Sequence, residues 1–130
     1  MEVLLLPVGD ELYAVPIHNF REVVAEPRVT RIPVAPPEVM GLVNVRGEIV
    51  PLFDAAALLS TGKTATASFA AVVGTGSSAA ALATTAAPHT EPLGKRAGAS
   101  SIPGARGIYR QGDALAILLD VDALLTRLHQ

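Results

Sequence analysis

The residues best suited to metal binding or acid–base chemistry are three histidines, His18, His89 and His129. They are far apart in the sequence, and none has a second histidine close to it. The chain contains no cysteine, which excludes disulfides, thiolate metal sites and a thiol nucleophile. The sequence therefore predicts no metal site.

The carboxylates also lack a catalytic arrangement. Asp10 with Glu11, Asp54, and Asp120 with Asp122 all occur where a turn or a helix start already explains an acidic residue. The glycine-rich stretches lack the lysine of a phosphate-binding loop, and the serines lack a Gly-x-Ser-x-Gly context. We therefore expect no hydrolytic, transfer or redox activity, and no cofactor.

Arg46 differs from these residues because it stands at the predicted tip of a hairpin, between Val45 and Gly47. Asn44 precedes it by two residues and shares its polar face. From this local pattern, Arg46 is either a solvated arginine beside a turn or a guanidinium that forks onto the carboxylates or carbonyls of a partner. The pattern alone does not decide between the two.

Composition and charge argue against a nucleic-acid-binding or membrane protein. The 130 residues are half hydrophobic, but 22 of them are alanine, which buries little area, and the net charge is −2. This balance gives no basic surface for nucleic acid and no polybasic segment for a membrane surface. Ala65–Ala87 carries no Asp, Glu, Lys or Arg, but it is dominated by alanine and small polar residues, so we do not expect it to span a bilayer. Because an acid stands where a signal peptide needs a basic region, we expect a cytoplasmic protein.

Short strands separated by turn residues dominate the pattern and favour an all-β barrel assembly. Two short helices are expected where Asp54 and Asp120 stand at N-cap positions. A helical turn is expected at residues 38–40, and a long loop over Ala86–Ile108. Glu22–Ala25 is expected to be a single strand. Four hairpins are also expected, and in chain order they are Val3–Val8 with Leu12–Val15, Leu42–Arg46 with Glu48–Phe53, Ser68–Val73 with Ala79–Thr84, and Ile108–Arg110 with Ala114–Leu119.

A longer series of residues resembles the CheW-like chemotaxis coupling family. Its central part runs Ile32-Pro33-x-Ala35-Pro36-x-x-Val39-x-Gly41-Leu42-Val43-Asn44-Val45-Arg46-Gly47-Glu48-Ile49-Val50-Pro51-Leu52-Phe53-Asp54. The opening Gly9–Ile17, the segment Phe20–Val24 and the ending Leu115–Leu125 also resemble elements of that family, in the same order. The resemblance therefore covers most of the chain.

The resemblance implies a mostly β fold of two small five-stranded SH3-like barrels that share a hydrophobic core, with short helices. It implies a non-catalytic adaptor that couples the cytoplasmic tip of chemoreceptors to the regulatory domain of a CheA-type histidine kinase. It also implies a receptor-facing groove, and Glu22 is expected there to pair with Arg46. The residues expected to line this groove are Phe20, Glu22, Gly41, Val43, Asn44 and Arg46.

The chain departs from the family pattern in its second half. Over residues 1–130 we expect a single CheW-like domain whose second barrel, from about residue 66, is reduced, because Ala80–Ala86 lacks the usual bulky residues. Low burial predicts fast amide exchange over Ala79–Ile108. This departure motivates an alternative, a CheW-like interaction domain of a non-chemotaxis two-component or surface-motility pathway. A small nucleic-acid-binding barrel is disfavoured by the charge and by the five aromatic residues.

Overall fold

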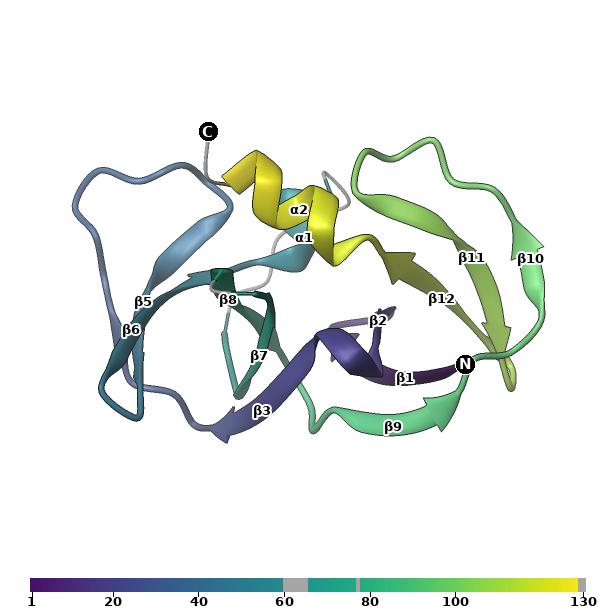
Figure 1. Cartoon of the computed structure of the whole chain (residues 1–130), viewed down its shortest axis with the longest axis horizontal. Coiled ribbons are helices and arrows are strands. Elements are labelled where there is room, and N and C mark those ends of the chain that lie inside the picture. Colours follow the sequence, from purple (N-terminus) through teal and green to yellow (C-terminus); the bar gives the residue numbers. More distant parts are fainter. Residues whose placement is uncertain (60–65, 77, 129–130) are drawn as a thin grey trace.

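The computed structural model describes residues 1–59, 66–76 and 78–128, and its chain folds into two six-stranded sheets. His129, which the sequence analysis considered as a metal ligand, lies outside the described residues. Two helices, α1 (Ala55–Leu58) and α2 (Val121–Leu128), lie over the junction between the sheets (Figure 1).

One sheet, called sheet A here, takes its strands from both ends of the described chain. Its strands, in spatial order, are β10 (Arg96–Gly98), β11 (Ala105–Gln111), β12 (Ala114–Leu119), β2 (Glu11–Pro16), β1 (Glu2–Val8) and β9 (His89–Pro92). The β2–β12 pair is parallel and joins the two halves of the sheet, with Leu12 opposite Ala116.

The other sheet, sheet B, is built from the middle of the chain. Its strands, in spatial order, are β3 (Phe20–Ala25), β7 (Phe69–Thr75), β8 (Ser78–Thr84), β6 (Glu48–Phe53), β5 (Val39–Val45) and β4 (Val29–Thr30). A short 3₁₀ helix, η1 (Ile17–Asn19), leads from β2 into β3. Here too a single parallel pair, β6 with β8, joins two antiparallel groups of strands.

Three clusters of apolar side chains hold the sheets together. Each sheet encloses a cluster of its own, built on Val43, Val50 and Val72 in sheet B and on Val3 and Leu5 in sheet A. The third and largest cluster contains residues of both sheets and of both helices. The shared core expected from the family resemblance is therefore present.

The helices begin where the sequence predicts. The Asp54 carboxylate accepts hydrogen bonds from the backbone N–H groups of Ala56 at 3.0 Å and Ala57 at 3.3 Å. The Asp120 carboxylate accepts one from Ala123 N at 3.1 Å. Both acids act as N-caps, which satisfy backbone donors that a helix start leaves unpaired.

The predicted fold class is confirmed, with corrections to individual elements. Each sheet has six strands rather than five, and short edge strands that the sequence did not predict belong to both: β4 in sheet B, and β9 and β10 in sheet A. The predicted helical turn at residues 38–40 is wrong, since β5 already begins at Val39 and pairs with Phe53 of β6. The predicted loop over Ala86–Ile108 contains β9, β10 and the start of β11.

Strand β8 corrects the expected weakness of the second half. Its residues from Ala79 to Thr84 are all buried, and β8 lies between β7 and β6 in the middle of sheet B. A strand with partners on both sides can use small side chains there, because alanine lets neighbouring layers approach closely. The predicted division at about residue 66 also differs from the sheets, since β7 and β8 pair with β3 and β6.

This burial changes the expected pattern of hydrogen exchange. We expect the amides of β8 to exchange as slowly as those of β5 and β6, because opening them requires separating the centre of sheet B. The amides of residues 99–102, which form no strand and are at least partly exposed, should exchange much faster. Native-state exchange followed by NMR tests this, and equal protection of the two segments would contradict it.

Among the described residues, no helix combines the length and the apolar composition that crossing a bilayer requires.

Candidate functional site

The turn between β5 and β6 displays Arg46. Val45 pairs with Glu48, which leaves Arg46 and Gly47 as a two-residue loop. Both have positive φ, +53° and +88°, the pattern of a type I′ turn. Asparagine or glycine is favoured at the first of these positions, and another residue there costs about 1–2 kcal/mol. Turn geometry therefore does not explain an arginine at this place.

Asn44 holds this turn in shape. Its side-chain Oδ1 accepts a hydrogen bond from the backbone N–H of Gly47 at 2.8 Å. Val43 and Val45 are buried while Asn44 and Arg46 are exposed, as the predicted alternation requires. Asn44, predicted as a partner-contacting residue, thus has a structural role in presenting Arg46.

Arg46 is tied to β3 by an ion pair. Its Nε lies 3.3 Å from Oε1 of Glu22, as the sequence predicts. The Arg46 side chain is 83% exposed and that of Glu22 is 31% exposed. Such an exposed pair contributes about 0–1 kcal/mol to stability, so its main effect is to orient the guanidinium.

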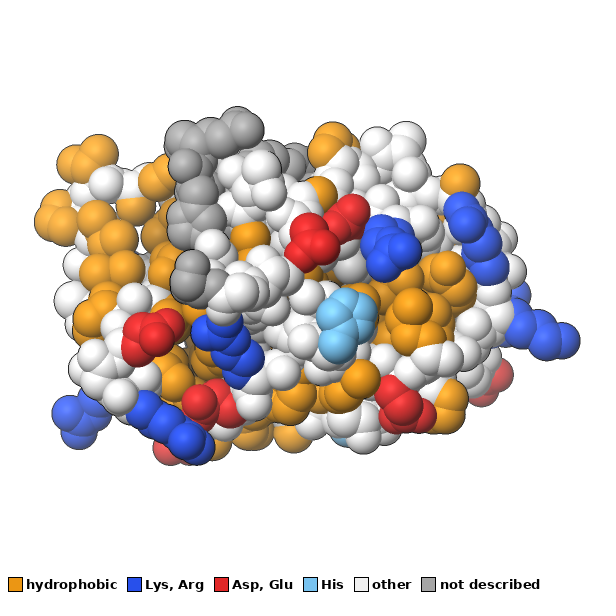
Figure 2. All heavy atoms as spheres, viewed as in Figure 1, with side chains coloured by type: hydrophobic (Ala, Val, Ile, Leu, Met, Phe, Trp, Pro, Cys, Tyr) orange, Lys and Arg blue, Asp and Glu red, His pale blue; other side chains and the backbone are white. Residues whose placement is uncertain are grey.

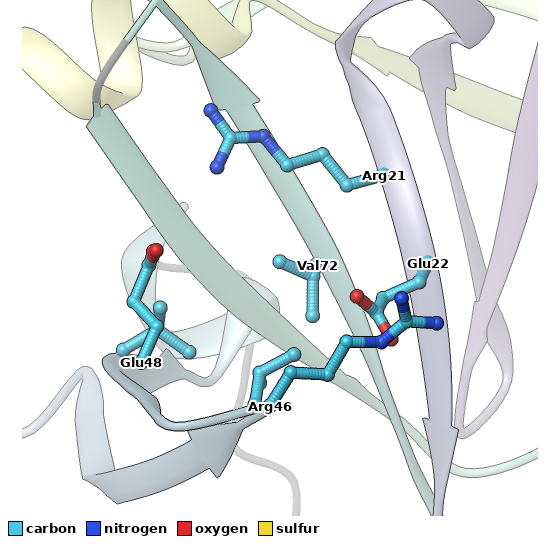
Figure 3. Close-up of a pocket in the computed structure, with 7 residues that line it drawn as sticks. Arg21, Glu22, Arg46, Glu48 and Val72 are labelled. Carbon is cyan, nitrogen blue, oxygen red and sulfur yellow. The ribbon is translucent and has the colours of Figure 1, made fainter.

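A pocket of about 190 Å³ opens beside this ion pair, between β3 and the β5–β6 turn (Figure 3). Val45, Val50 and Val72 line its floor, and they belong to the apolar cluster inside sheet B. Four charged residues form its rim: Arg21, Glu22, Arg46 and Glu48. In Figure 2, acidic and basic side chains gather over this end of sheet B, with hydrophobic side chains between them.

Two rim residues were missed by the sequence analysis, and they differ in their surroundings. The Nη2 of Arg21 donates to the backbone carbonyls of Gly76 at 2.8 Å and Ser78 at 3.4 Å, so Arg21 braces the β7–β8 turn. Glu48 is exposed, and among the described residues no basic group lies within 4.0 Å of its carboxylate. Period-two alternation could have found Glu48, because it lies two residues before the pocket-lining Val50.

The six residues predicted for the groove are only partly brought together. Glu22 and Arg46 line the pocket, and Asn44 supports its turn. Phe20 packs instead against the core shared by the sheets, and Val43 is buried within sheet B. Gly41 is buried against β4, where an added Cβ would lie 2.5 Å from the carbonyl oxygen of Thr30.

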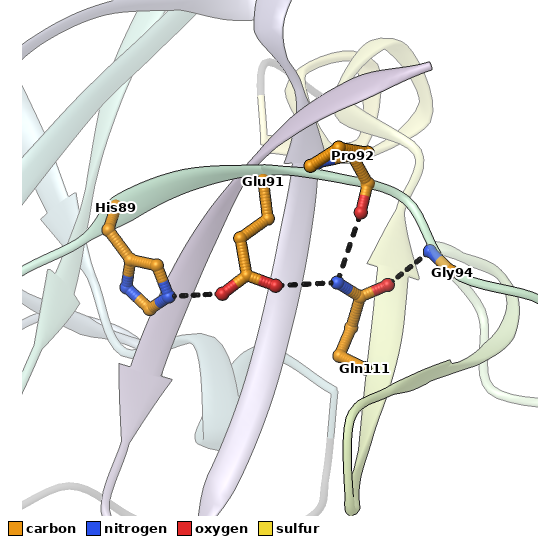
Figure 4. Close-up of polar contacts among 5 residues, drawn as sticks. All are labelled: His89, Glu91, Pro92, Gly94 and Gln111. Carbon is orange, nitrogen blue, oxygen red and sulfur yellow. Dashed lines mark hydrogen bonds and ion pairs between the residues drawn. The ribbon is translucent and has the colours of Figure 1, made fainter.

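A second polar cluster joins two strands of sheet A (Figure 4). The buried Gln111 donates from Nε2 to Oε1 of Glu91 at 3.1 Å and to the carbonyl of Pro92 at 3.2 Å, and it accepts from the N–H of Gly94. Nε2 of His89 lies 2.8 Å from the other Glu91 oxygen. One glutamine thereby connects β9 and the chain that follows it to β11. Within the described ranges, no three of the His, Asp and Glu residues are grouped so that they could hold a metal ion.

Comparison with known proteins relates the chain to one family. The profile of the CheW-like domain matches residues 2–129. The chain is 47% identical over 47 residues to a chemotaxis protein CheW of Helicobacter pylori, and 36% identical over 53 residues to one of Treponema pallidum. These matches cover 36% and 41% of this chain, and only 28% and 31% of those proteins.

The fold is also similar to a solved structure, that of the scaffolding protein TtCheW from Thermoanaerobacter tengcongensis. The TM-score is 0.75 at 24% identity, over 92% of this chain and 88% of that one. This likeness concerns the arrangement of the two sheets.

Proposed function

The chain belongs to the family of CheW-like domains, and from this premise we propose that it is a non-catalytic adaptor that couples chemoreceptors to a histidine autokinase in bacterial chemotaxis. Its partners are then the cytoplasmic tip of a chemoreceptor and the regulatory domain of a CheA-type kinase, and its place is the cytoplasm. The family profile and the curated relatives support the chemotaxis context.

The observation that carries this proposal is the conformation of Arg46. A charged side chain, 83% exposed, stands in a left-handed backbone conformation that disfavours it, and Asn44 and Glu22 fix its position. Unfavourable local geometry that the surrounding structure maintains is typical of functional sites. Arg46 is therefore the residue we expect to contact the receptor.

The alternative is an interaction domain of a non-chemotaxis two-component or surface-motility pathway. It was motivated by the expectation that the second barrel is reduced. Burial of β8 in the middle of sheet B removes most of that motivation. Chemotactic coupling is the function that we retain.

Replacing Arg46 tests the proposal through binding. Arg46→Ala and Arg46→Asn should each weaken binding to a receptor-tip fragment by more than tenfold, because a charge-assisted contact at the centre of an interface contributes roughly 2 kcal/mol. Arg46→Asn should melt at the same temperature as the wild type or slightly higher, since asparagine suits the turn. Titration calorimetry and thermal unfolding measure the two effects separately.

Arg110→Ala is the matched control, because Arg110 is an exposed arginine on β11 of the other sheet. It should leave the affinity for the receptor-tip fragment unchanged. Equal affinities of the wild type and both Arg46 variants, or a large fall in melting temperature on replacing Arg46, would exclude Arg46 as a binding residue.

A further inference from the structure

The rim of the pocket beside Arg46 carries one carboxylate, that of Glu48, that no described basic residue neutralises. Glu22 is paired with Arg46, and the guanidinium of Arg21 donates to two carbonyls. The side-chain carboxylate of Glu48 has no hydrogen bond or ion pair with any other described residue, although its backbone pairs with Val45. Figure 3 places Glu48 and the Arg46–Glu22 pair on opposite sides of Val72, so the uncompensated charge lies across the opening from the ion pair.

The floor of the pocket is apolar although it opens to solvent. Val45, Val50 and Val72 all belong to the cluster inside sheet B, and each is almost fully buried. A volume of about 190 Å³ leaves room for one branched aliphatic side chain over these three valines. Aliphatic side chains gain free energy by leaving water for such a surface.

We propose that the pocket receives one aliphatic side chain of the receptor tip and that Glu48 selects a segment with a lysine or arginine beside that side chain. This rests on the proposed function for the identity of the partner, but the chemistry follows from the pocket itself. A cation on the segment meets the carboxylate of Glu48, and an acidic segment is repelled by it. Glu48 is thus a specificity-determining residue and Arg46 is the anchor.

Two blocked peptides test the pocket without the receptor. Ac-Gly-Ile-Lys-Gly-NH2 should shift the ¹H–¹⁵N resonances of Val45, Glu48, Val50 and Val72, with an affinity at least threefold higher than that of Ac-Gly-Ile-Glu-Gly-NH2. Glu48→Gln should abolish this preference, and Glu48→Lys should reverse it. Glu2→Lys is the matched control, because Glu2 is also an exposed glutamate at the first position of a strand, and it should leave the preference unchanged.

Three results would overturn the proposal: equal affinity for the two peptides, shifts confined to other residues, or no binding of either peptide up to its solubility limit. The spectrum of each variant also reports whether that variant is folded. The receptor-tip fragment then separates this proposal from the proposed function. If the fragment binds in an Arg46-dependent way that Glu48→Lys does not alter, the selection by Glu48 is wrong and the adaptor function stands. If the peptides behave as expected and the fragment does not bind, the pocket stands and the proposed receptor partner is wrong.

Discussion

Gly41→Ala is expected to lower the free energy of unfolding by about 4 kcal/mol, and the melting temperature by about 15 °C. The register of β5 against β6 shifts between Val39 and Gly41, and at this irregularity the backbone of Gly41 has a φ of +151°. A Cβ there would lie 2.5 Å from the carbonyl oxygen of Thr30 and 2.6 Å from Cγ1 of Val29. Because the first of these atoms is backbone in β4, relief requires moving that strand away from β5.

Gly9→Ala serves as the control for backbone strain alone. Gly9 also has a positive φ, +61°, but an added Cβ would meet nothing within 4 Å. We expect this variant to lose only about 1 kcal/mol. Urea unfolding of both variants measures the difference, and a loss for Gly41→Ala no larger than that for Gly9→Ala would show that the contact with β4 is not tight.

Leu82→Ala should cost about 3 kcal/mol of unfolding free energy. Leu82 is 3% exposed and is the one large apolar side chain of β8, whose other residues are small. It packs in the core that the two sheets share, so its removal leaves a cavity that the surrounding alanines cannot fill. We expect a lower midpoint in urea with an unchanged slope.

Leu115→Ala removes the same atoms from a side chain of β12 that is 53% exposed. This control should stay within about 0.5 kcal/mol of the wild type, as surface substitutions usually do. Similar losses for the two leucine variants would mean that β8 does not anchor the shared core.

The sequence predicted the features of the fold that depend on neighbouring residues. Alternation and turn glycines identified the hairpin that carries Arg46, and the positions of Asp54 and Asp120 identified both helix starts. The strands that join the halves of each sheet could not be placed in this way. The parallel pairs β2–β12 and β6–β8 connect segments that are distant in the sequence, and β9 and β10 are short, polar edge strands with little alternation.

The candidate site was also predicted only in part. The contact between Glu22 and Arg46 was predicted from the family motif, and the structure contains it. The pocket was not predicted, because its lining combines residues of β3, β7 and the β5–β6 hairpin, and no local spacing relates them. Phe20 and Val43 were expected in the groove because of their place in the motif. They do not line this pocket, because their apolar side chains pack in the cores, and their contact with a partner stays a prediction.

The strands of sheet A come from distant parts of the sequence, and this determines the order in which the chain can fold during synthesis. The strands of sheet B all lie within residues 20–84, so they can pair while the ribosome is still making the rest. The β1–β2 hairpin is made before sheet B, but its partner strands β9 and β12 are made after sheet B. Until then the apolar side chains of Val3 and Leu5 lack the strands that cover them. Pairing between segments so distant in the chain is slow. We therefore expect folding to finish with the docking of the hairpin onto β12, and the nascent hairpin to be the segment that a chaperone would protect.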